Sequence, residues 1–152
     1  MTAAASTFLV VEDGREYTER FARLLGARFR FTRAGSAEEA AALACGGAVG
    51  LLLDLDFGRT APDQLIDDNG RAAGAHPDGE RRRLAAVQGI LILRALRRAG
   101  VTLPALLFAD LDDAEQIAFL QSDLHPLRVV ASSAGLQEIA RLLDRLAAGQ
   151  PL

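Results

Sequence analysis

The sequence predicts an α/β fold in which helices cover a parallel sheet. Short apolar runs of strand length alternate along the chain with segments of helical period, which is typical of βαβ units. The chain has 152 residues, of which 50% are hydrophobic and 24% charged, so it can form one soluble domain with a substantial core. We therefore expect a single domain over residues 1–152.

Five units of strand and helix follow one another along the chain. The strands are expected at residues 7–11, 28–33, 49–54, 103–109 and 127–131, and the helices at 20–28, 37–45, 78–100, 112–121 and 135–148. The alternation of the second strand favours a sheet edge. In the first helix Phe21, Leu24 and Leu25 are expected on one apolar face. Ser36 and Glu39 form a capping box that begins the second.

The connection after the third strand is unusually long. Residues 57–77 are rich in Gly, Pro, Asp and Asn and have no sustained period, which predicts an inserted loop. Residues 78–100 then predict one continuous helix, with Asp78 as its N-cap and Gly100 at its end.

Composition narrows the classes of function. A net charge of −3 gives no basic footprint for nucleic acid or a membrane surface. The one cysteine, Cys45, cannot form an internal disulfide, and the first residues become charged too soon for a signal peptide or a membrane span. We therefore expect a cytoplasmic protein. All 17 basic residues are arginine.

Carboxylates follow two of the predicted strands. Glu12 and Asp13 come directly after the first, and Asp54 ends the third. Ligands of open parallel sheets collect beyond the carboxyl ends of the strands, where these three side chains would meet. Clustered carboxylates repel one another, and a cation such as Mg²⁺ relieves the repulsion. The alternative is that each acid simply solvates a strand end.

The stretches FLVVEDG, FRFTRAGSAEEAAAL, LLLDLD and PALLFADLDD resemble the receiver domain of bacterial response regulators. The resemblance extends over almost the whole chain except residues 57–77. It implies a flavodoxin-like, doubly wound sheet of five parallel strands in the order 2-1-3-4-5. It also implies Asp54 as the phosphoacceptor and a Mg²⁺ site formed by Glu12, Asp13, Asp54 and the backbone carbonyl of Asp56.

Three positions depart from the family's pattern. Ala109 stands where the family has Thr or Ser, Ser132 where it has a lysine that pairs with the phosphoaspartate, and Val129 where it has an aromatic switch residue. No shift of the alignment restores the lysine, because the chain has none. We therefore expect phosphorylation of Asp54 to be absent or weakly coupled to conformation. An arginine from the run 81–83 could neutralise the pocket, although a solvated helix start is the simpler interpretation.

The resemblance implies an atypical receiver that acts as a signalling protein–protein interaction module and not as an enzyme. Its partners would be a histidine kinase or a downstream effector, and nucleic acid and membranes are not expected. A homodimer is also implied, through a face with charges at Arg141, Asp144 and Arg145. The apolar positions of that face are Ala118, Phe119, Val129, Leu136 and Ile139.

Two alternatives stay open. The first is a phosphorylatable single-domain receiver in a two-component phosphorelay. The second is a Mg²⁺-dependent phosphatase, because DLDFG also resembles the opening motif of haloacid-dehalogenase-like enzymes, with Asp54 and Asp56 as the catalytic pair.

Overall fold

A computed structural model describes residues 4–152 as a parallel sheet with helices on both faces. The strand order is β2-β1-β3-β4-β5, and every neighbouring pair is parallel. The strands are β1 Thr7–Val11, β2 Arg30–Ala34, β3 Gly50–Asp54, β4 Ala105–Phe108 and β5 Leu127–Val130. The predicted flavodoxin-like fold, its strand order and the edge position of the second strand are therefore confirmed.

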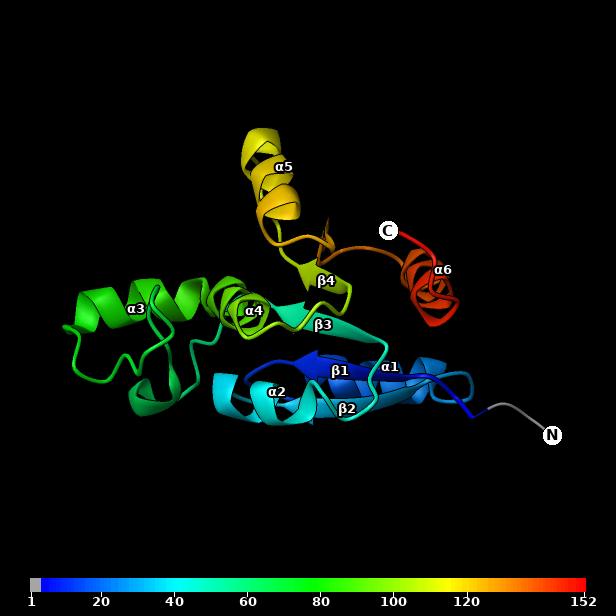
Figure 1. The fold of residues 1–152 in the computed structure, drawn as a ribbon, viewed down its shortest axis with the longest axis horizontal. Coiled ribbons are helices and arrows are strands. Elements are labelled where there is room, and N and C mark those ends of the chain that lie inside the picture. Colours follow the sequence, from blue (N-terminus) through cyan, green and yellow to red (C-terminus); the bar gives the residue numbers. More distant parts are fainter. Residues whose placement is uncertain (1–3) are drawn as a thin grey trace.

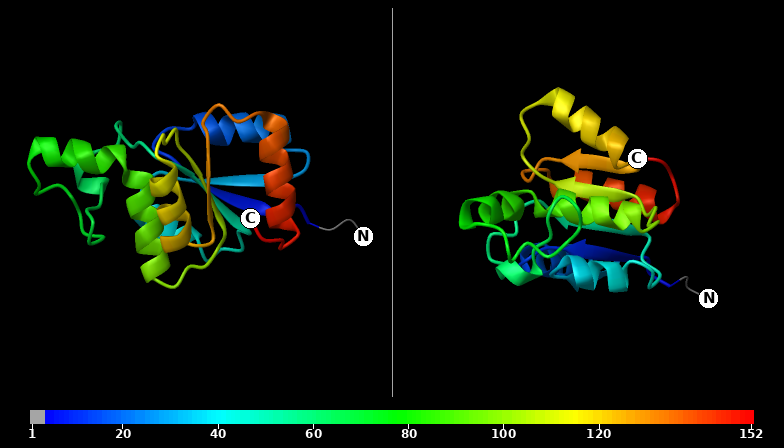
Figure 2. Two further views of the ribbon diagram at one scale, coloured as in Figure 1. Left: turned by 90° about the horizontal axis from the view of Figure 1, so that it is seen from above. Right: turned by 60° about the vertical axis from the view of Figure 1, so that its left-hand side comes forward.

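Six helices of the α type and one short 3-10 helix (η1) connect and cover the strands in the described part of the chain. They are α1 Glu16–Leu25, α2 Ala37–Leu43, η1 Pro62–Gln64, α3 Asp78–Ala86, α4 Gln88–Arg98, α5 Ala114–Asp123 and α6 Leu136–Ala147. Helices α1 and α6 pack on one face of the sheet, while α2, α4 and α5 lie on the other (Figures 1 and 2). Within residues 4–152 we find no helix with the length and apolar character needed to span a bilayer.

The alternation of side chains along β1 explains the two layers. Phe8 and Val10 pack with α1 and α6, whereas Leu9 and Val11 pack with α2 and α4. All four are at most 1% exposed, as expected for a strand of a parallel sheet covered on both faces. Helix α1 differs from its predicted face, because Phe21 and Leu25 are buried while Leu24 is 45% exposed.

The inserted segment 57–77 packs onto the body of the protein. Its buried side chains, Phe57, Leu65, Ile66 and Ala73, belong to the same core cluster as α4. Together with α3 it extends past the carboxyl ends of the strands, at the left of Figure 1. This segment therefore borders the edge of the sheet where the acidic residues lie.

The prediction of one helix over 78–100 is wrong, because the helix breaks at Val87. Within an unbroken helix the amide of Gly89 would donate to the carbonyl of Ala85. Instead the Gly89 amide donates to the carbonyl of Leu55 at 3.0 Å, and the Ala85 carbonyl accepts from the amide of Phe57 at 2.8 Å. The chain leaving β3 thus inserts its own backbone groups into the helix.

The two predicted helix starts had different outcomes. Ser36 caps α2, since its side chain accepts a hydrogen bond from the amide of Glu39 at 3.2 Å, as predicted. Asp78 is the first residue of α3 and not its N-cap, which is Pro77.

Candidate functional site

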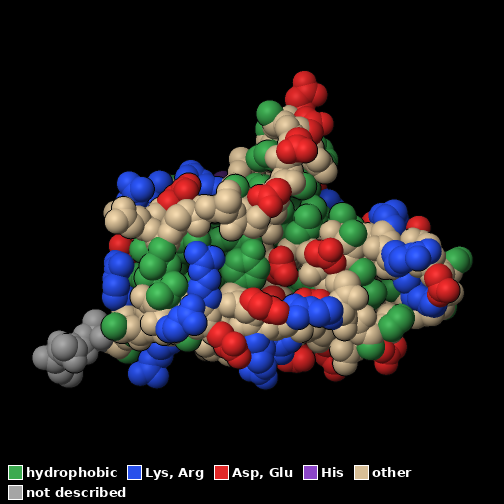
Figure 3. Space-filling model, turned by 180° about the vertical axis from the view of Figure 1, so that it is seen from behind, with side chains coloured by type: hydrophobic (Ala, Val, Ile, Leu, Met, Phe, Trp, Pro, Cys, Tyr) green, Lys and Arg blue, Asp and Glu red, His purple; other side chains and the backbone are tan. Residues whose placement is uncertain are grey.

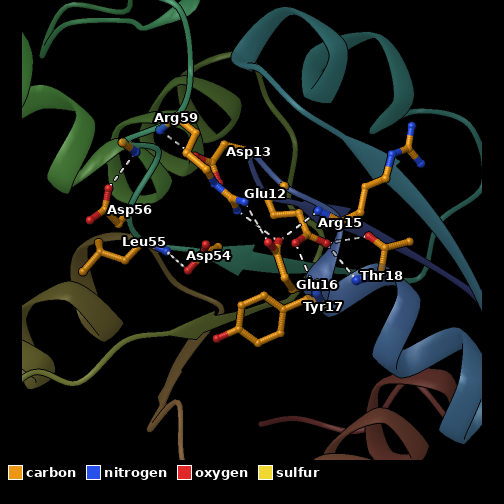
Figure 4. A network of polar contacts seen from close by, with 12 residues as sticks. Glu12, Asp13, Arg15, Glu16, Tyr17, Thr18, Asp54, Leu55, Asp56 and Arg59 are labelled. Atoms are coloured by element: carbon orange, nitrogen blue, oxygen red, sulfur yellow. Dashed lines mark hydrogen bonds and ion pairs between the residues drawn. The ribbon is translucent and has the colours of Figure 1, made fainter.

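The fold brings the acidic residues of two strands to one edge of the sheet. Glu12 and Asp13 follow β1, while Asp54 ends β3 and Asp56 follows it, and the two strands are neighbours in the sheet. Figure 4 shows these side chains together with Arg59 from the inserted segment. The predicted meeting of acids is therefore observed, and what each carboxylate binds decides what the site can do.

Glu12 holds the start of α1. The residue is 1% exposed, and one carboxylate oxygen accepts from the amide of Tyr17 at 3.2 Å. The other oxygen accepts from the amide and the hydroxyl of Thr18, at 2.8 and 2.7 Å. The N-cap residue of α1, Arg15, makes no side-chain cap of its own. Glu12 therefore satisfies the free amides of the first helical turn, a role usually taken by the N-cap.

Asp13 is bound to Arg59. One of its carboxylate oxygens accepts from the Arg59 amide at 2.9 Å, and the other accepts from the guanidinium Nη2 at 3.2 Å. The guanidinium also donates to both oxygens of Glu16, at 2.7 and 3.0 Å, which lowers the pKa of Glu16 to about 2. The Asp13 side chain is only 4% exposed. Arg59 thus supplies positive charge to this edge of the sheet.

Asp54 is half-buried at the centre of the site. Its Oδ1 accepts a hydrogen bond from the amide of Leu55 at 2.9 Å. Burial, together with the nearby charges of Asp13, Glu12 and Asp56, raises the pKa of Asp54 to about 6, although the hydrogen bond from Leu55 lowers it. Asp54 therefore gives up its proton less readily than an exposed aspartate does.

The residues present do not fit the implied Mg²⁺ ion. Among residues 4–152, no group of three or more His, Cys, Asp or Glu side chains is arranged to hold a metal. Two of the expected ligands are engaged by the chain itself, because Glu12 caps α1 and Asp13 binds Arg59. The Asp56 side chain, which is not one of the expected ligands, accepts from the amide of Gly58 at 2.7 Å. Hard divalent cations need several free oxygen ligands, which this arrangement does not offer.

The three substituted positions lie at the ends of β4 and β5. Ala109 directly follows β4, and its amide donates to the carbonyl of Val130 at 2.9 Å. Ser132 is bound to Asp110 by its hydroxyl and, at 3.0 Å, by its amide, which lowers the pKa of Asp110. The amide of Val129, on the edge strand, donates to the side chain of Gln121 at 3.0 Å. The Ser132 hydroxyl is therefore engaged by a neighbouring acid.

Two of the three arginines of the run 81–83, Arg81 and Arg83, have other partners. Arg81 binds Asp78 and, at 2.8 Å, the carbonyl of His76, while Arg83 binds Glu80 and Asp68. These contacts stabilise the inserted segment and α3.

A cavity of about 470 Å³ opens next to Asp56. Its lining residues are Asp56, Gly58, Thr60, Pro62, Leu65, Asp78, Arg81, Arg82, Ala85 and Ala86.

Sequence reasoning missed Arg59, Gln88 and Gly89. Gln88 is fully buried, and its side chain accepts from the amide of Ile66 at 2.8 Å, which fixes the inserted segment against α4. The signal for Gln88 and Gly89 is a polar and a small residue interrupting an apolar run. For Arg59 it is an arginine three residues after Asp56, on the loop that leaves the acidic edge.

Replacing Asp54 by Asn should stabilise the protein near neutral pH. The folded-state pKa of about 6 lies above the value of about 3.9 in an unfolded chain, so the stability that the protonated form contributes is present below about pH 4 and lost as the pH rises through about 6. Allowing for partial exposure, we expect Asp54→Asn to gain on the order of 1 kcal/mol at about pH 7.5 and almost nothing at about pH 4.

Urea denaturation at the two pH values measures this difference. The control is Asp63→Asn, which removes the same charge from an exposed position of the inserted segment. An equal gain for Asp54→Asn at both pH values would contradict the shifted pKa.

Comparisons with known proteins identify the fold. No protein-family model matches the sequence, and no curated protein matches it. Solved structures do match. The receiver domain of Francisella response regulator 1452 superposes with a TM-score of 0.66 at 14% identity, over 93% of this chain and 95% of that one. The chemotaxis protein CheY4 of Vibrio cholerae gives 0.64 at 14% identity, over 94% and 99%.

A third similar structure is the signal receiver domain of a signal transduction histidine kinase from Syntrophus aciditrophicus. It superposes with a TM-score of 0.63 at 17% identity, over 95% of this chain and 92% of that one. The chain therefore has the receiver-domain fold.

Proposed function

We propose that this chain is a receiver-type signalling module that acts through protein contacts, and that Asp54 does not serve it as a phosphorylation switch. The observation that carries the proposal is the engagement of Ser132 by Asp110 beside Ala109, at the strand ends where the resemblance expects a phosphoryl group to be sensed.

A phosphoryl group on Asp54 would need donors that this edge of the sheet lacks. Such a group brings strong acceptor oxygens and additional negative charge, which cationic or hydroxyl donors must stabilise. The methyl group of Ala109 cannot donate, the Ser132 hydroxyl is bound to Asp110, and the chain contains no lysine. Phosphorylation of Asp54 would therefore not change the conformation of β4 and β5.

The proposed partner surface is the face formed by α5, β5 and α6. Phe119 of α5 is 64% exposed. Val129 of β5 is half-buried against the core on the α5 side of the sheet, and Leu136 of α6 is half-buried against the core on the other side. Large exposed aromatic side chains are typical of protein contact sites. We propose a histidine kinase or an effector as the partner, in the cytoplasm, with a second copy of the chain as another candidate.

Two residues expected on this face contribute less than predicted. Ile139 is 2% exposed and belongs to the core under α6. Asp144 forms an ion pair with Arg28 of its own chain, so it is already partnered.

We also propose that the chain is not a phosphatase. In that mechanism Asp56 would act as the general acid, but its carboxylate accepts from the amide of Gly58 and holds the turn after β3. The second candidate function is a phosphorylatable receiver, which the half-exposed carboxylate of Asp54 at the sheet edge favours.

Beryllofluoride, which stands in for a phosphoryl group on aspartate, provides the experiment. We expect amide NMR spectra with Mg²⁺ and beryllofluoride to show no saturable shifts in β4, β5 or α5, because no donor connects Asp54 to them. Asp54→Asn is the control, since it cannot form the adduct. Saturable shifts that depend on Asp54 and reach those elements would favour the second candidate.

A further inference from the structure

The inserted segment delivers a guanidinium group to the acidic edge. Four hydrogen bonds join Arg59 to the loop after β1 and to the first residue of α1, one from its backbone amide and three from its guanidinium. They end on the carboxylates of Asp13 and Glu16 (Figure 4). Because Arg59 lies just after β3, this contact holds the beginning of the inserted segment on the start of α1.

Gly14 leaves room for this guanidinium beside the loop. A Cβ atom on Gly14 would lie 2.2 Å from Nη2 of Arg59 and 2.1 Å from a carboxylate oxygen of Glu16, so a side chain there would push the ion pair apart. Arg33, from β2, donates to the backbone carbonyls of Gly14 and, at 2.7 Å, of Asp13. The loop is therefore held by one arginine on each side.

Arg59 reduces the repulsion between the carboxylates of this site, as a bound metal ion would. A guanidinium bound to two carboxylates neutralises their charge through strong, charge-assisted hydrogen bonds. We infer that Arg59 is the resident counter-cation of the acidic edge and that it excludes divalent cations from Asp13 and Asp54. Glu12 is committed to α1, so Asp13 is the carboxylate for which Arg59 and a metal ion would compete.

Because Arg59 belongs to the inserted segment, the position of that segment determines how far the negative charge of the site is neutralised. Acidic and basic side chains lie close together on the face seen in Figure 3. A partner that lifts Arg59 would expose Asp13 and favour cation entry, and by thermodynamic linkage a cation would favour that partner. None of this depends on whether Asp54 accepts a phosphoryl group.

Mn²⁺ alone is the probe, because it takes the same oxygen ligands as Mg²⁺ and broadens the NMR signals of nearby amides. For the unmodified chain we expect no saturable broadening around Asp13 and Asp54. For Arg59→Ala we expect saturable broadening at these residues, with the affinity for Mn²⁺ raised about tenfold or more because the competing charge is gone.

Two variants complete the test. Arg83→Ala is the matched control, since Arg83 also bridges two carboxylates, on Glu80 and Asp68, with a side chain 50% exposed against 63% for Arg59. Arg59→Lys keeps the charge and should behave like the unmodified chain. Thermal melting checks that each variant folds. The inference is overturned if Arg59→Ala gains no Mn²⁺ affinity, if Arg83→Ala gains as much at Asp13, or if the unmodified chain already binds as tightly.

Discussion

Replacing Gly89 by alanine should destabilise the protein by about 3 kcal/mol or more, although alanine is the better helix former. A Cβ atom at this position would stand 2.0 Å from the carbonyl oxygen of Asp54 and 3.1 Å from the Cα of Leu55. Both are backbone atoms of the strand end that carries the site, and backbone cannot swing aside as a side chain does. Either α4 or the end of β3 must move.

The loss of stability is large because the same contact holds the chain at the break between α3 and α4. The Gly89 amide donates to the carbonyl of Leu55 at 3.0 Å, and the neighbouring Ala85 carbonyl accepts from the Phe57 amide at 2.8 Å. Separating the two segments would lose both hydrogen bonds and leave buried backbone groups unpaired. We therefore also expect large amide shifts at Asp54 and Leu55 in the NMR spectrum of the variant.

Gly79→Ala is the matched control for this substitution. Gly79 lies in α3 with nothing within 4 Å of the position of a Cβ atom, so alanine there should be neutral or should stabilise the protein by about 0.5–1 kcal/mol. Urea denaturation of both variants measures the difference. If Gly89→Ala proved as stable as Gly79→Ala, the close approach of α4 to β3 would be wrong.

Replacing Glu12 by alanine should cost about 2–3 kcal/mol of stability, because it leaves the part-buried amides of Tyr17 and Thr18 without their acceptor. The two interpretations of Glu12 predict opposite signs. As one of several clustered metal ligands without a metal, Glu12 would repel Asp13 and Asp54, and its removal would be neutral or stabilising. As the cap of α1, Glu12 stabilises the folded protein with or without a metal ion, so its removal destabilises the protein.

Glu16→Ala is the control for Glu12→Ala. It also removes one carboxylate from the beginning of α1, but that side chain is 65% exposed and makes no contact with the amides of the first turn beyond Arg15. We expect a much smaller loss of stability, measured by urea denaturation without divalent cations. If the Glu12→Ala protein were as stable as the unmodified chain, Glu12 would not be the cap of α1 and would instead be a free carboxylate.

The strands were predictable because each is a local apolar run. TFLVV and GLLLD are buried on both faces, and such runs need no knowledge of the rest of the chain. The order of the strands came from the resemblance to receiver domains. The position of the acids at one edge followed from the order, since β1 and β3 are neighbours.

The contacts of the acids were not predictable, because each depends on a distant partner. The break at Val87 arises from backbone groups of Leu55 and Phe57, about thirty residues earlier, and Gln88 and Gly89 mark the place without revealing those partners. Arg59 reaches Asp13 across 46 positions of the sequence. Glu12 looked like a ligand because its residue type suits one, while its geometry makes it a helix cap.

The central claim, that Asp54 is not the acceptor of a phosphorylation switch, is tested most directly by the beryllofluoride titration followed by amide NMR. We expect no saturable shifts in β4, β5 and α5, with the ion pair of Asp13 to Arg59 and the hydrogen bond of Ser132 to Asp110 left in place. Saturable shifts that start at Asp54, extend into β4 and β5, and disappear in Asp54→Asn would contradict it.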